Sequence, residues 1–192
     1  MANIRDYLHF RGDLSLLQDP FNEVDGLILS EISYIDYSGI VKEEPDRRVG
    51  FEEATEAFFD GKDQKDLSLG AILPDEILDL CKDAAAAPRF SGASLTAYRN
   101  VKKEGAQDSE KMQWAVLTFL LPDDSLFIAF SGTDDSLVSW KEDLDMAVED
   151  VLPSQKLAVA YINELASAYS GKLLRIGGHS KGGNIAVYSA AN

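Results

Sequence analysis

Cysteine and histidine are scarce in this sequence, which has one cysteine, Cys81, and two histidines, His9 and His179, among 192 residues. A single cysteine cannot form a disulfide within the chain, and Cys81 lies in an apolar helical pattern that predicts a buried thiol rather than a reactive one. One cysteine and two histidines also cannot supply the four ligands of a structural zinc site. We therefore expect no disulfide, no metal and no cofactor.

Positive charge and long apolar runs are lacking as well. The 18 lysines and arginines are outnumbered by 33 acidic residues, which gives a formal net charge of −15 and disfavours nucleic-acid binding, while neutral ester substrates are unaffected. The apolar run at 115–121 is too short to cross a bilayer, and residues 1–20 lack the apolar core of a signal peptide. The sequence predicts a cytoplasmic protein without a transmembrane segment, and it carries no signal for an oligomeric state.

The N-terminal part of the chain has helical patterns and no clear strand. Asn22 is a suitable N-cap for a helix that continues to about residue 35, and two shorter helices are predicted over 51–59 and 74–87. Proline at the start of the last helix and directly after its end agrees with these bounds. We expect residues 1–88 to be a helical lead-in.

From residue 89 the period of the apolar residues changes to that of strands alternating with helices. This order predicts an α/β protein, a mixed sheet flanked by helices in a single domain over 1–192. The loop 102–111 is predicted to be a solvated hairpin. Strands are expected near 93–101, 112–121, 126–130 and 172–176, a hairpin turn at 122–125, and helices near 136–148, 155–169 and from 181 onward.

The clearest motif is Gly178-His179-Ser180-Lys181-Gly182, which follows an apolar strand and precedes an alanine-rich helix. A serine hydroxyl becomes a useful nucleophile when the chain turns sharply and exposes it, and the residues two before and two after it must then be tiny. Gly178 and Gly182 satisfy this need, and Gly183 gives further room. The alternative is a glycine-rich turn with an incidental serine, but the correct flanks favour a nucleophile elbow at Ser180.

The strand 126–130 ends in a second turn of small residues, Ser131-Gly132-Thr133. In a serine hydrolase, two backbone amides stabilise the oxyanion of the tetrahedral intermediate, one following the nucleophile and one from an earlier strand-ending loop. These amides would belong to Lys181 and Thr133. The alternative is an ordinary turn at the end of a strand.

The segment 134–148 has an apolar stripe that includes Trp140. A mobile amphipathic helix of this kind could act as a lid over an apolar site. The alternative, which we favour, is a fixed surface helix packed on the core. Its acidic residues match no EF-hand spacing and are expected to be solvated.

These motifs carry a family resemblance. The turn Phe130-Ser131-Gly132-Thr133, then Trp140 and Asp143-Leu144, and the Gly-rich serine motif resemble the class 3 lipases of the α/β-hydrolase superfamily, although Ser131 replaces their common arginine. The resemblance implies an oxyanion residue at Thr133 and a lid around Trp140. The serine motif, together with residues 6–8 and 20–25, resembles more narrowly a bacterial lipase-like family, the Mbeg-like domain of unknown function.

A complete catalytic triad is missing from the sequence. In this fold an acidic residue and then a histidine follow the nucleophile, but residues 181–192 contain neither. His9 precedes the nucleophile and His179 is held beside it, so neither is suited to act as the base. We expect a C-terminally truncated domain, inactive alone, whose acid and base lie beyond residue 192. The predicted function is cleavage of lipid or acyl esters, the alternatives being a thioesterase, a peptidase or a non-catalytic interaction protein.

Overall fold

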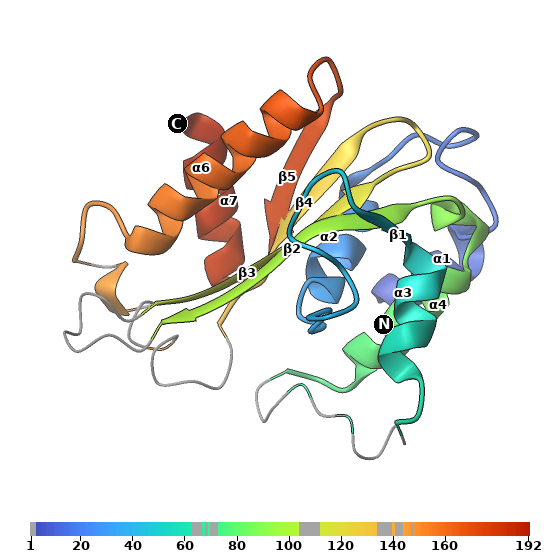
Figure 1. The fold of residues 1–192 in the computed structure, drawn as a ribbon. Coiled ribbons are helices and arrows are strands. Elements are labelled where there is room, and N and C mark those ends of the chain that lie inside the picture. The colour runs from blue at the N-terminus through green and yellow to red at the C-terminus, as the bar shows by residue number, and fades with distance from the viewer. Residues whose placement is uncertain are drawn as a thin grey trace.

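The computed structural model describes residues 3–62, 67, 69, 73–103, 112–133, 140, 144–146 and 148–192, which form one sheet between two groups of helices (Figure 1). The strands are β1 (Arg48–Gly50), β2 (Ser94–Lys103), β3 (Met112–Leu120), β4 (Leu126–Phe130) and β5 (Leu174–Gly178). The helices are α1 (Ile4–Arg11), α2 (Glu23–Ile32), α3 (Phe51–Phe59), α4 (Glu76–Ala86), the 3-10 helix η2 (Pro88–Phe90), α6 (Pro153–Ala168) and α7 (Lys181–Ala191).

The sheet is mixed, as predicted. Its strands lie in the order β1-β2-β3-β4-β5, with the first four antiparallel and β5 parallel to β4. The predicted hairpin is confirmed, because β3 pairs with β4 and the intervening turn includes Asp124 at a φ of 64°. The parallel pair places Phe130 opposite Gly178, so both strands end at the same edge of the sheet.

The prediction that residues 1–88 contain no strand is wrong. Arg48–Gly50 forms the short edge strand β1, which pairs with Ser94–Thr96 of β2. Three residues are too few to show a period-two pattern, and their partner lies more than 40 positions further along the chain. Only the tertiary pairing identifies this strand.

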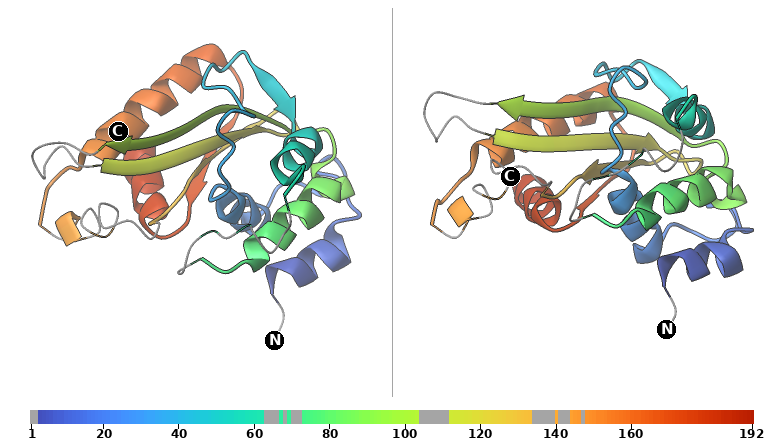
Figure 2. Two further views of the ribbon diagram at one scale, coloured as in Figure 1. Left: turned by 60° about the horizontal axis from the view of Figure 1, so that its bottom comes forward. Right: turned by 90° about the horizontal axis from the view of Figure 1, so that it is seen from below.

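Helices cover both faces of the sheet, with α1 to α4 on one side and α6 and α7 on the other (Figures 1 and 2). The alternating side chains of β4 show the division, since Phe127 and Ala129 join the first core and Ile128 and Phe130 join the second. A strand with both faces covered is apolar throughout, which explains the unbroken apolar sequence of Leu126–Phe130.

The predicted helices of the lead-in are present with small shifts at their ends. Asn22 caps α2 as expected, and its side chain accepts hydrogen bonds from the amides of Val24 and Asp25. The helix stops at Ile32 rather than near residue 35, and the chain turns at Ser33. This early end directs Tyr34 toward the end of β5. The predicted loop at 102–111 begins later than expected, because Lys102 and Lys103 belong to β2. Its residues 104–111 and most of the predicted helix at 136–148 lie outside the described residues.

A buried ion pair ties α2 to η2. Arg89 and Asp25 have side chains with no exposed area, and the guanidinium donates to both carboxylate oxygens, with Nε–Oδ1 at 2.6 Å and Nη2–Oδ2 at 2.5 Å. The same guanidinium donates to the carbonyls of Leu14, Asp19 and Pro20. Hydrogen bonding to Asp25 raises the pKa of Arg89, which outweighs the effect of burial. The pair therefore fixes the loop before α2 to the rest of the lead-in.

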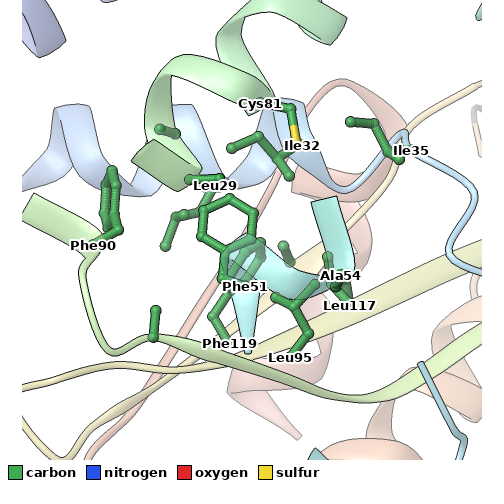
Figure 3. Close-up of a cluster of buried hydrophobic side chains, with 14 of the residues drawn as sticks. Leu29, Ile32, Ile35, Phe51, Ala54, Cys81, Phe90, Leu95, Leu117 and Phe119 are labelled. Carbon is green, nitrogen blue, oxygen red and sulfur yellow. The ribbon is translucent and has the colours of Figure 1, made fainter. Parts of the chain in front are cut away.

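The lone cysteine belongs to α4 and points into the core, among the apolar side chains of α2 and α3 (Figure 3). Cys81 is fully buried, and its Sγ lies 3.3 Å from the hydroxyl of Tyr37. Burial raises the pKa of the thiol to about 11. The prediction of a buried cysteine is confirmed.

We expect Cys81 to resist thiol reagents in the folded protein. With a pKa of about 11, about one thiol in a thousand is ionised at pH 8, and the thiolate is the reactive form. Titration with a chromogenic disulfide should detect almost no thiol in the native protein and one thiol per chain in denaturant. Rapid stoichiometric reaction of the native protein would contradict this burial.

Candidate active site

The turn between β5 and α7 gives Ser180 an unusual backbone conformation. The strand ends at Gly178, the helix begins at Lys181, and Ser180 between them has φ 54° and ψ −123°. A positive φ costs a non-glycine residue about 1–3 kcal/mol and persists only where the surroundings impose it. Ser180 is exposed at this turn. The sequence predicted a sharp strand-to-helix turn at this residue, and the backbone makes it.

Two glycines allow the turn because side chains at their positions would collide with backbone atoms. A Cβ added to Gly178 would lie 2.5 Å from the carbonyl oxygen of Gly182 and 2.6 Å from that of Phe130. A Cβ added to Gly182 would lie 2.1 Å from the Phe130 oxygen. At Gly183 the nearest atom would be 3.2 Å away, so this position is less restricted. The glycines therefore bring α7 against the end of β4.

The parallel pairing of β4 and β5 also brings the second turn against the first. A Cβ added to Gly132 would lie 2.6 Å from the His179 carbonyl oxygen and 3.1 Å from the Cβ of Ser180. Thr133 follows directly and is partly buried. Residues separated by almost 50 positions in the chain are thus neighbours at the carboxyl edge of the parallel strands, where open α/β sheets commonly bind ligands.

Lys181 has a structural role that the sequence did not predict. Its side chain is 3% exposed, and its Nζ donates to the carbonyl oxygen of Gln113 at 2.9 Å. The start of α7 is thereby attached to β3. The amides of Gly182 and Gly183 donate to the carbonyls of His179 and Ser180, each at 2.9 Å, which closes the first turn of the helix.

His179 turns toward α2. Its Nδ1 forms a 2.8 Å hydrogen bond with the hydroxyl of Tyr34, and its Nε2 lies 3.7 Å from Glu31 Oε1. Burial raises the pKa of Glu31, while the charge of His179 acts in the opposite direction. A Cβ added to Gly132 would lie 2.3 Å from the Tyr34 hydroxyl. This hydroxyl therefore contacts both the turn at Gly132 and the turn at His179. Sequence reasoning missed Tyr34 and Glu31, because nothing local links them to a residue about 145 positions away.

Neither His9, which the sequence excluded as the base, nor Trp140, the possible lid residue, belongs to this cluster in any described contact. His9 lies on α1 with its ring centroid 4.9 Å from that of Phe10. Trp140 is 52% exposed, and Leu144 and Val148 of the same predicted stripe are also exposed. Residues 134–139, 141–143 and 147 of the proposed lid are outside the described residues.

A pocket of about 360 Å³ opens beside the second turn. Tyr34, Ser131 and Gly132 line it at the end near Ser180, and the pocket extends between the end of α3 and the strands β2 and β3. Its volume lies within the range of small-molecule sites, about 300–1,000 Å³. Within the described part of the chain, no cluster of three or more histidine, cysteine, aspartate or glutamate side chains is suited to hold a metal. None of the described helices has the length and apolar character needed to cross a membrane.

Comparison with known families shows to which family the chain belongs. The family model described as Mbeg1-like matches residues 84–192, more than half of the chain, and the protein therefore belongs to the Mbeg1-like family. Comparisons with curated proteins and with solved structures gave no match. The narrower family resemblance is confirmed over residues 84–192, while residues 6–8 and 20–25, which also carried it, lie outside the matched region. The matched region contains both turns of the candidate site.

Proposed function

We propose that the protein is a serine hydrolase of the lipase or esterase type, built on an α/β-hydrolase-like sheet, with Ser180 as its nucleophile. The observation that carries the proposal is the conformation of Ser180, an exposed serine with a φ of 54° between a strand and a helix. Asp124 in the β3–β4 hairpin turn also has a positive φ, but Ser180 combines its φ with a ψ of −123°, which lies outside the left-handed helical region. Strain of this kind concentrates at functional sites. The resemblance to class 3 lipases, carried by the same residues, supports the same chemistry.

The proposed reaction begins when Ser180 Oγ attacks the carbonyl carbon of an ester while a base accepts its proton. The oxyanion of the tetrahedral intermediate would be stabilised by the backbone amides of Thr133 and Lys181, together with the N-terminal dipole of α7. Collapse of the intermediate expels the alcohol and leaves an acyl-enzyme, which water hydrolyses. The contact between Gly132 and Ser180 supports this assignment, since it brings the Thr133 turn to the nucleophile.

The base is proposed to come from outside residues 1–192, with an acidic residue to orient it. Neither histidine of the sequence has a described contact with Ser180, because His179 is bound to Tyr34 and His9 packs against Phe10 on α1. His179 instead acts in this proposal as a structural residue that holds the elbow against α2. The resemblance implies a lid around Trp140, whereas the arrangement we favour for its segment is a fixed surface helix. The proposed location is the cytoplasm.

A fluorophosphonate probe tests the nucleophile directly. We expect the full-length protein to be labelled at Ser180, as mass spectrometry of the modified peptide would show, and labelling to be abolished in Ser180→Ala. The matched control is Ser170→Ala, which removes an exposed serine from an ordinary turn and should leave labelling unchanged. A folded full-length protein that is not labelled, or is labelled equally after Ser180→Ala, would refute the proposal.

A non-catalytic interaction protein on the same scaffold is the second candidate. It is favoured by the two histidines of the sequence, neither of which has a described contact with Ser180. The same labelling experiment separates the two functions, because a scaffold without an activated serine would not react. Turnover of matched ester, thioester and peptide substrates would distinguish an esterase from a thioesterase or a peptidase.

A further inference from the structure

We infer that the pocket beside Gly132 binds the acyl group of the substrate, and that this group is a short chain with a polar end rather than a long fatty acyl chain. The inference rests on the proposed function of Ser180 and specifies its substrate class. It is argued from the position, the volume and the lining of the pocket.

The position of the pocket suits an acyl group attached to Ser180. Gly132 lines one end of the pocket, and the same residue lies against the Cβ of Ser180. A carbonyl bonded to Ser180 Oγ and directed toward the Thr133 amide would therefore begin at this end. Tyr34 stands at the junction, since it lines the pocket, contacts Gly132 and is held by His179.

The volume limits the length of the chain. At about 30 Å³ for each group the size of a water molecule, a pocket of about 360 Å³ holds about a dozen non-hydrogen atoms. Part of that space opens to solvent at the outer end, so an acyl chain of about eight carbons would fill the pocket. A chain of sixteen carbons would extend well beyond it into water.

The lining of the pocket changes along its length. Near the serine it is closed by the buried side chain of Ser131, and an apolar wall is provided by Phe58, Leu69 and Leu73. The buried Ala115 lies one strand further from the serine, directly opposite Asn100 of β2. The outer end is polar and exposed. Asp36, Asn100 and Lys102 are found there.

Asp36 is the anionic group at this outer end. Burial alone would raise its pKa, but hydrogen bonds from Ser38, Tyr98 and Asn100 prevail and lower the pKa, so the group is a carboxylate at neutral pH. A fully apolar tail would leave this carboxylate and the neighbouring polar groups facing hydrocarbon, which is unfavourable. An acyl group with an apolar body and a hydrogen-bonding end fits both parts of the pocket.

The test is a chain-length series on the full-length protein. Esters of p-nitrophenol with acetyl, butyryl, octanoyl and palmitoyl groups should give the highest kcat/KM at butyryl or octanoyl, with palmitoyl at least tenfold lower. Fluorophosphonates with short and long alkyl chains should show the same order in their labelling rates, which does not depend on turnover. A maximum at palmitoyl would overturn the inference.

Two variants test whether this pocket sets the limit. Ala115→Val narrows the pocket opposite Asn100, one strand beyond Ser131. It should lower kcat/KM for octanoyl by about tenfold to a hundredfold relative to acetyl, as expected when a hydrophobic pocket loses room for a methylene. Lys102→Trp fills the exposed outer end, keeps the hydrogen bond between Asn100 and Asp36, and should act in the same direction. The control is Ala86→Val, an exposed alanine lining a different pocket on α4, which should leave the chain-length profile unchanged.

The possible failures are distinguishable. If the fluorophosphonates label Ser180 but both variants leave the profile unchanged, the pocket inference is wrong and the proposed function stands. If no probe labels Ser180, the proposed function is wrong, and the inference about the pocket is wrong as well.

Discussion

Arg89→Met should lower the free energy of unfolding by about 3–5 kcal/mol, because it leaves the carboxylate of Asp25 buried without its cation. Both side chains have no exposed area, and the guanidinium also satisfies the carbonyls of Leu14, Asp19 and Pro20. All these acceptors would lose a charged donor in one substitution. Chemical denaturation followed by circular dichroism measures the loss, provided that the slope of the transition is unchanged.

Two further variants separate the stability that the buried pair contributes from the general effect of removing a charged side chain. Arg99→Met removes the surface pair with Glu164, whose side chain is 43% exposed, and should cost less than about 1 kcal/mol. In the double variant Asp25→Asn with Arg89→Met, neither charge of the pair remains buried. The asparagine side-chain oxygen can still accept the hydrogen bond that the backbone amide of Asn22 donates to Asp25 at 2.9 Å. This double variant should be more stable than Arg89→Met alone. A cost for Arg89→Met no larger than that for Arg99→Met would show that the pair does not stabilise the fold as described.

Gly182→Ala should destabilise the protein by about 3 kcal/mol, although alanine is normally the better helix former by about 1 kcal/mol. The added methyl carbon would lie 2.1 Å from the carbonyl oxygen of Phe130 and 2.7 Å from its carbonyl carbon. Both are backbone atoms of a central strand, so neither can move without breaking pairing with β3 or β5. Denaturation measurements should show the loss, and the altered turn should also reduce fluorophosphonate labelling at Ser180.

The neighbouring glycine provides the matched control. Gly183→Ala adds the same methyl group one residue further along α7, where the nearest atom would be 3.2 Å away. A shift of a few tenths of an ångström relieves that contact, so we expect a change of less than about 1 kcal/mol. Equal losses at the two positions would show that the close approach of α7 to β4 is not what requires glycine at 182.

The strands and helices could be largely predicted because their signals are local. The hairpin between β3 and β4 followed from two apolar runs separated by a four-residue turn, and Asn22 marked the start of α2. The strand β1 could not be predicted, since its three residues become a strand only by pairing with β2. The end of α2 at Ile32 was missed as well, because apolar residues continue on the same face past the turn.

The candidate site was predictable in part for the same reason. The glycine requirement at 178 and 182 is a steric property of the turn around Ser180, so the sequence motif carries it. The contact of Tyr34 with His179, the attachment of Lys181 to β3 and the pocket between α3 and the sheet join segments that have no local relation. No periodicity or spacing encodes such contacts.

The sequence by itself determined the mixed α/β character of the chain, the buried cysteine and the sharp turn at Ser180, all of which depend on periodicity or on the sterics of a few adjacent residues. The tertiary structure decided which segments became neighbours. The parallel pairing of β4 with β5 brought Gly132 to Ser180, and the packing of α2 brought Tyr34 to both. Pairing and packing are set by the free energy of burying whole faces against one another, and that energy is a property of the assembled fold rather than of any segment.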